Sequence, residues 1–163
     1  MSVSSLKALL LLVILGGLAV TPVKAQDDAA GVKAASDAFY SALRARDINA
    51  LEAAWADADY VTLVQPVGPQ TIIIGRDAVR VAFEMTFSRQ AVAVTLSTIA
   101  IIDPVVQIRD SVAWEIGLEG NPAQPVGATN GAMTTNIYEK IDGQWLMVAH
   151  IRHPSVTVPA AAP

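Results

Sequence analysis

The sequence contains no cysteine. Its absence excludes disulfide bonds, a thiolate nucleophile and a lipid-anchored cysteine. The folded state must therefore be stabilised by its apolar core alone. Hydrophobic residues make up 53% of the chain, and this content predicts a folded rather than a disordered protein.

Histidine is scarce as well, since the chain has only His150 and His153. Their odd spacing on one strand would direct the two rings to opposite faces, whereas a zinc site needs several ligands at one point. The sequence also lacks a glycine-rich phosphate loop, a Gly-x-Ser-x-Gly motif and an HExxH motif. We therefore expect no metal site, no cofactor, and neither serine-hydrolase nor zinc-protease chemistry.

Basic residues are few and do not cluster. The chain has 11 Lys and Arg against 15 Asp and Glu, which gives a formal net charge of −4. Nucleic-acid binding depends on grouped basic side chains that neutralise phosphates. We therefore expect no nucleic-acid partner.

The N-terminus has the pattern of a secretory signal peptide. Lys7 precedes an apolar run of about 13 residues, and Val23-Lys24-Ala25 follows before Gln26. A membrane-spanning helix needs roughly 20 apolar residues, so we expect cleavage after Ala25 rather than a retained anchor. The predicted organisation is a signal peptide over residues 1–25, one domain over 26–153 and a frayed tail over 154–163. The mature protein would be secreted or periplasmic, with no membrane partner.

Apolar periodicity predicts helices first and strands afterwards. The expected helices cover residues 27–46, then from an N-cap at Asp47 to about Asp57, and then from Gly75-Arg76-Asp77 to Phe87, with Asp77 as a candidate cap. The expected strands cover 60–64, 71–74, 92–102, 105–118, 128–141 and 144–151. This order indicates an α+β fold, with helices packed on one face of a curved, mainly antiparallel sheet.

Asp142-Gly143 favours a two-residue type I′ hairpin turn. If Ile141 pairs with Gln144, the predicted register continues with Glu139–Leu146, Ile137–Val148, Thr135–His150 and Met133–Arg152. One face would then carry His150 and Arg152 among apolar residues. The opposite face would carry Asn136, Tyr138, Met147, Ala149 and Ile151.

Four segments together resemble one known family. They read ASDAFYSALRARDINALEAAWAD, QPVG, IIGRDAVRVAF and NIYEKIDGQWLMVAH, and their order is similar to that of the SnoaL-like branch of the nuclear transport factor two-like superfamily. The resemblance implies a cone, in which a bent sheet and helices enclose an apolar pocket and the open sheet face packs on a second subunit. The superfamily includes isomerases, dehydratases, cyclases, epoxide hydrolases and binding or assembly domains, so the fold alone does not assign an activity.

Ketosteroid isomerase, a member of that superfamily, allows a comparison by position. The place of its catalytic base falls on Gln65, which cannot take a proton at neutral pH. The place of its oxyanion acid falls on Ile137, and that of its oxyanion tyrosine on Phe39, next to Tyr40. Steroid-type enolisation is therefore not expected, and cyclases that use the same base position are disfavoured for the same reason.

His150 and Glu115 are the candidate catalytic residues, because both are expected on the concave face, where a carboxylate could orient an imidazole. Each also has a simpler reading, since His150 could be a hydrogen-bonded core residue and Glu115 could lie on a solvated strand face. The candidate ligand-binding residues are Trp55, Gln65, Thr135, Ile137, Val148 and Arg152.

Three functions are consistent with these residues. The first is a homodimeric domain that binds a small apolar or weakly anionic molecule in its cone. The second is a lyase, isomerase or hydrolase that uses His150 and Glu115 as an acid–base pair. The third is a homo-oligomeric assembly module whose open sheet face is the functional surface.

Overall fold

The computed structural model describes residues 23–65, 72–125 and 131–153. The helices are α1 (Val23–Ala45), α2 (Ile48–Ala54), α3 (Arg76–Phe87) and α4 (Gln90–Leu96). The strands are β1 (Thr62–Val64), β2 (Ile72–Ile74), β3 (Ala100–Arg109), β4 (Val112–Gly120), β5 (Ala132–Ile141) and β6 (Gln144–Arg152). The apolar run of the predicted signal peptide, most of the 65–69 loop and the predicted tail lie outside the described residues.

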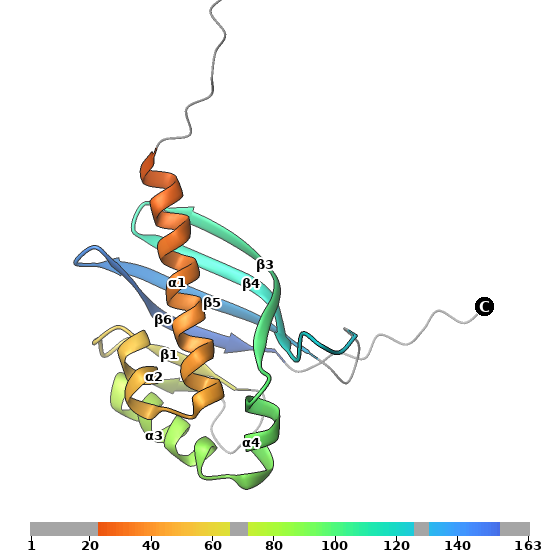
Figure 1. The fold of residues 1–163 in the computed structure, drawn as a ribbon. Helices are drawn as coiled ribbons and strands as arrows, with labels where there is room; N and C mark the ends of the chain where they lie inside the picture. The colour runs from red at the N-terminus through yellow and green to blue at the C-terminus, as the bar shows by residue number, and fades with distance from the viewer. Residues whose placement is uncertain (1–22, 66–71, 126–130, 154–163) are drawn as a thin grey trace, which may run out of the picture.

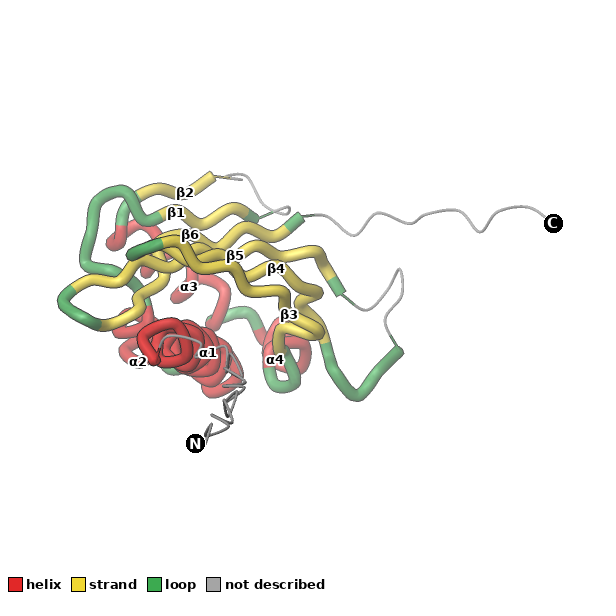
Figure 2. The backbone as a smooth tube through the Cα atoms, turned by 90° about the horizontal axis from the view of Figure 1, so that it is seen from above, coloured by secondary structure: helices red, strands yellow, loops and turns green. Residues whose placement is uncertain are grey.

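The strands form one six-stranded sheet in the order β2-β1-β6-β5-β4-β3. Only the β1–β6 pair is parallel. The helices lie against one face of this curved sheet, and the other face is left open (Figures 1 and 2). The predicted α+β fold with a mainly antiparallel sheet is therefore confirmed.

Two helix starts show how local chemistry sets the element boundaries. Asp47 is the N-cap of α2, as predicted, and its carboxylate accepts hydrogen bonds from the backbone N–H groups of Asn49 and Ala50, each at 3.0 Å. The predicted cap of α3 is wrong by two positions. Gly75 occupies the cap with φ 95°, a conformation open to glycine, while Asp77 lies in the first turn, where its charge favours the helix dipole.

Two of the expected strands are wrong. The predicted strand over 92–102 begins with α4, because a short apolar run does not distinguish a strand from a buried helix. The predicted strand over 105–118 is a hairpin of β3 and β4 that reverses at Asp110, where φ is 53°. Asp103-Pro104 does not end a strand but lies at a bulge in β3, an edge position that tolerates proline.

The β5–β6 hairpin has the predicted turn, since Asp142 and Gly143 have φ values of 51° and 84°. The predicted pairs Ile141–Gln144 and Glu139–Leu146 are present. Beyond them the predicted register is wrong, because a β-bulge leaves Val148 as an extra residue in β6. The pairs after the bulge are Ile137–Ala149, Asn136–His150, Thr135–Ile151 and Thr134–Arg152.

The bulge changes which side chains share a face. Met147, before it, and His150, after it, both lie on the helix-covered face, opposite buried Tyr138 and Asn136. Thr135 and Ile137, predicted for the pocket, lie instead on the open face of the sheet and are half-buried. His150 therefore lies in the interior, as predicted, but its neighbours differ from those that the turn alone suggested.

The core between the helices and the sheet is apolar at its centre. Phe39 of α1 is completely buried and packs on Tyr40, Trp55 and Phe83 as well as on the ring of His150, whose centroid lies 5.0 Å away. A row of buried polar side chains from β4, β5 and β6, joined by Ser36 of α1, lies beside this centre. Its members are Ser36, Glu115, Glu119, Thr134, Asn136 and His150.

Candidate functional site

A cavity of about 110 Å³ lies where the end of β6 meets α3 and α4. One part of its wall is mainly apolar, and the remainder carries the polar side chains of Gln65, Glu119, His150 and Arg152. The other lining residues are Leu43, Leu63, Phe83, Thr86, Val92, Thr95, Leu96 and Ile99. An apolar cavity with a few converging polar groups is the usual form of a small-molecule site.

The structure brings together three of the predicted site residues, Gln65, His150 and Arg152. The lining of this cavity does not include Trp55, Glu115, Thr135, Ile137 or Val148. Val148 is buried at the bulge in β6.

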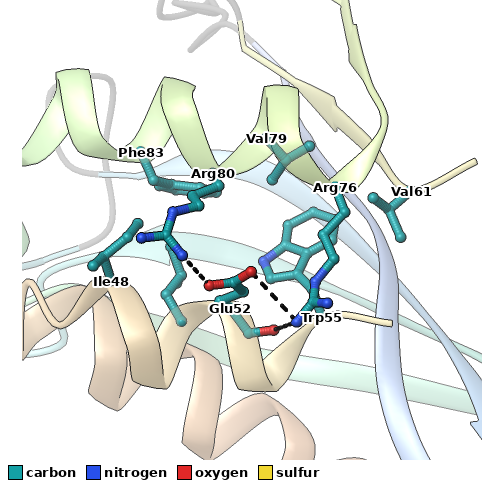
Figure 3. A pocket seen from close by; sticks show the side chains of 9 residues that line it. Ile48, Glu52, Trp55, Val61, Arg76, Val79, Arg80 and Phe83 are labelled. Carbon is teal, nitrogen blue, oxygen red and sulfur yellow. Dashed lines mark hydrogen bonds and ion pairs between the residues drawn. The ribbon is translucent and has the colours of Figure 1, made fainter. Parts of the chain in front are cut away.

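Trp55 belongs to a second and much smaller cavity, of about 10 Å³, between α2 and α3 (Figure 3). In this region Arg76 and Arg80 form ion pairs with Glu52. The indole N–H of Trp55 is buried, with no hydrogen-bond partner among the described residues. The expected place of Trp55 in the wall of the larger pocket is therefore not observed.

Glu119 is the polar residue of the cavity that the sequence analysis missed. Its carboxylate Oε1 lies 2.6 Å from Nε of Arg152, and its Oε2 lies 3.4 Å from Nε2 of His150. Tyr40 donates its hydroxyl proton to the same Oε2 over 3.3 Å. The side chain of Glu119 is 2% exposed, so its polar partners are these protein groups rather than bulk water.

Strand geometry explains why Glu119 reaches these partners. Residue 117, between Glu115 and Glu119 on the same face, is a glycine that pairs with Thr134, and Thr134 pairs with Arg152. The space that a side chain at Gly117 would occupy is filled by Ile101 of β3, whose Cγ1 would lie 2.7 Å from a Cβ there. The sequence did place Glu119 on the same strand face as Glu115, because residues four apart on a strand share a face. The same alternation of polar and apolar residues is also typical of a strand with one solvated face, so it did not identify Glu119 as a cavity residue.

Glu115 is enclosed by donors behind the cavity. Ser36, Tyr138 and the Nδ2 of Asn136 all donate hydrogen bonds to its Oε2, each over 2.9 Å. The expected direct contact between Glu115 and His150 is replaced by a bridge through the Asn136 side chain. A catalytic role for His150 stays a prediction.

The Asn136 amide sets the tautomer of His150. Its Nδ2 donates to Glu115, so its Oδ1 faces the imidazole, 2.7 Å from Nδ1 of His150. That nitrogen must then carry the ring proton in the neutral imidazole. The lone pair of Nε2 is consequently directed toward Glu119.

Burial shifts the pKa values of two residues of the cavity wall, His150 and Glu119. Desolvation, assisted by the nearby Arg152 charge, lowers the pKa of His150 to about 3, so the ring is neutral at neutral pH. Desolvation also raises the pKa of Glu119, against the opposing effects of Arg152 and the Tyr40 hydrogen bond. The site therefore combines a neutral imidazole, a carboxyl group with a raised pKa and one arginine.

Across the described ranges, no group of three or more histidine, aspartate or glutamate side chains could hold a metal ion. Within the same ranges, no helix has the length and apolar character needed to cross a membrane.

We predict that His150 makes folding stability pH-dependent. Its pKa is lower in the folded protein than the ordinary 6.5. Below pH 6.5 the unfolded chain therefore binds a proton at this histidine, whereas the folded protein leaves the ring neutral. The stability contribution is complete above pH 6.5 and is lost as the pH falls toward 3, by up to about 1.4 kcal/mol per pH unit. In His150→Gln, chemical denaturation at several pH values should show a shallower loss.

Glu119 acts in the opposite direction, because its raised pKa favours proton binding by the folded state. The test is therefore the difference between variant and wild type in the slope of unfolding free energy against pH. His153→Gln, at an exposed position, is the matched control and should keep the wild-type slope. An unchanged slope in His150→Gln would contradict the assignment.

Comparisons with known proteins agree with this architecture. The solved structures that match include an association domain, NTF2-like proteins and a protein with a cystatin-like fold. A candidate calcium/calmodulin-dependent protein kinase type II association domain from Thiobacillus denitrificans is 26% identical, with a TM-score of 0.59 over 75% of this chain and 93% of that one. A candidate dehydratase of the NTF2-like family from Streptomyces avermitilis is 21% identical, with a TM-score of 0.59 over 82% and 99%.

An NTF2-like protein of unknown function from Pseudomonas putida is 16% identical, with a TM-score of 0.63 over 85% of this chain and 98% of that one. No curated protein matches the sequence. The family model of the SnoaL-like domain matches residues 32–159. This match covers most of the chain, and the protein therefore belongs to the SnoaL-like domain family, with a fold similar to that of NTF2-like proteins.

Proposed function

We propose that this SnoaL-like domain binds a small molecule with an apolar body and one polar or weakly acidic group. The observation that carries the proposal is the cavity between β6, α3 and α4, where Gln65, Glu119, His150 and Arg152 share an otherwise mainly apolar wall. Such a wall would bury the body of a ligand, while the polar groups would fix its orientation.

The size of the cavity limits the ligand. Its volume of about 110 Å³ is somewhat below that of the engineered cavity of about 150 Å³ that binds benzene. A ligand with about six non-hydrogen atoms is therefore the appropriate scale.

The charges of the cavity limit the ligand further. Arg152 is paired with Glu119, and His150 is neutral at neutral pH, so the described lining carries no excess charge. A strongly cationic ligand would lie beside the Arg152 charge, and the one carboxylate of the described lining, Glu119, is already paired with that arginine. A carbonyl, hydroxyl or carboxyl group could instead accept hydrogen bonds from Arg152 and Gln65.

We predict that filling the cavity abolishes ligand binding. Val92 of α4 lines it, whereas Val94 of the same helix is 78% exposed. In a thermal-shift panel of small acids, amides and alcohols, a ligand that stabilises the wild type should fail to stabilise Val92→Trp. Val94→Trp is the matched control and should respond as the wild type does. Equal responses of the two variants would place the ligand elsewhere.

We also propose that the protein is exported and acts outside the cytoplasm. The support is the charged, apolar and small-residue pattern before Gln26. In a secreting host, N-terminal sequencing of the mature protein should begin at Gln26. A mature chain that keeps the apolar run would contradict export by cleavage.

A second proposed property is homodimerisation through the open sheet face (Figure 2). Exposed apolar side chains from four strands lie on this face, an unusual arrangement for a surface that only meets water. They are Ile72, Ile74, Val105, Ile116 and Met133. A second copy is the favoured occupant, because one apolar face can meet itself across a two-fold axis. The name of the Thiobacillus denitrificans relative, an association domain, supports the same choice.

We predict that a charge on this face separates the subunits. Met133 is 55% exposed on the sheet, and Met85 is 56% exposed on α3. Size exclusion with light scattering should give a dimer for the wild type and for Met85→Asp, but a monomer for Met133→Asp, because the carboxylate would lose its water at the interface. A monomeric wild type would refute dimerisation.

A further inference from the structure

We propose that the cavity takes a small monocarboxylate in exchange for the internal carboxylate on Arg152, and that this exchange draws one proton onto Glu119. The inference deepens the proposed function and rests on it. It assigns a chemical class to the ligand. It also assigns a role to Glu119, which forms the ion pair with Arg152 in the absence of ligand.

The first step is that Arg152 already has an anionic partner. Oε1 of Glu119 lies 2.6 Å from its Nε, and no other carboxylate of the described residues forms an ion pair with it. A ligand carboxylate at this arginine would therefore compete with Glu119 for its single positive charge.

The second step concerns the displaced carboxylate. Glu119 is 2% exposed and cannot swing into water without leaving the sheet interior. A buried carboxylate without a cation is unfavourable, and such a group neutralises by binding a proton. Glu119 is therefore expected to become a carboxylic acid when the ligand takes over Arg152.

The third step is that the protonated acid already has an acceptor. Nε2 of His150 lies 3.4 Å from Oε2 of Glu119 and carries a lone pair, because Asn136 fixes the ring proton on Nδ1. A small approach would let the new O–H donate to this nitrogen. Desolvation keeps the pKa of His150 low and raises that of Glu119, so the proton stays on the acid.

The groups that face Glu119 come from several elements. Arg152 and His150 lie on β6, and Tyr40 lies on α1. The residues opposite Glu119 on the neighbouring strands are Ile101 of β3 and Ala132 of β5, which carry no charge. Tyr40 accepts a hydrogen bond from Nδ2 of Asn136 and donates its own proton to Glu119.

The charges balance in both states. Before binding, the arginine cation faces the Glu119 carboxylate. After binding, it faces the ligand carboxylate, while Glu119 holds one proton taken from solvent and donates a hydrogen bond through it to the imidazole. Binding of the anion thus consumes one proton, so the affinity must fall as the pH rises.

Calorimetry with butyrate and its neutral isostere butyramide tests this inference. Titrations between pH 6 and 8, in two buffers of different ionisation enthalpy, give both the dissociation constant and the number of protons exchanged. For the wild type we expect butyrate to bind with uptake approaching one proton, and its Kd to rise by up to about tenfold per pH unit. Butyramide should show no uptake.

Variants separate the roles of the two partners. Glu119→Gln imitates the protonated acid and should bind butyrate with no proton uptake and no pH dependence. Arg152→Gln should lose butyrate binding. Thermal melts establish that each variant is folded, and if Glu119→Gln fails to fold, the proton count of the wild type alone decides.

Butyrate binding to the wild type without proton uptake would overturn the inference. Binding of butyramide alone would also overturn it, yet would leave the proposed function in place. If the thermal-shift panel and both probes show no binding at all, the inference and the proposed function fail together.

Discussion

The positions of the polar groups in the cavity depend on the β-bulge at Val148. Without this extra residue, the alternation of β6 would place Trp145 and Met147 on one face and His150 and Arg152 on the other. With it, apolar Met147 completes the core while His150 and Arg152 still point inward. Because the bulge reverses the alternation of inward and outward side chains, one end of β6 packs in the apolar centre and the other end lines the polar part of the cavity.

Desolvation governs the chemistry of these inward-pointing groups. Glu115, Asn136, His150 and Glu119 are all buried, and each finds partners within the protein. Asn136 is central, because its two amide atoms connect Glu115 with His150 and so fix the imidazole tautomer. The buried polar row thus connects the sheet interior with the cavity, which is lined by two of its members, Glu119 and His150.

The two faces of the sheet have different roles in this architecture. The helix-covered face holds the core and the cavity, and α4 supplies part of the cavity wall. The open face carries exposed apolar side chains from several strands. The proposed ligand binding and the proposed assembly would therefore use opposite faces of the same sheet.

The sequence by itself determined what depends on near neighbours. The Asp47 cap, the Asp142-Gly143 turn and the mainly antiparallel α+β order follow from local rules, while the inward direction of His150 and Arg152 was implied by the family resemblance. Only the tertiary structure decided the helix at α4, the bulge at Val148 and the pairing of Glu119, rather than Glu115, with β6. The reason is physical: a short apolar run or a strand register is settled by what packs against it, and those partners lie far away in the chain.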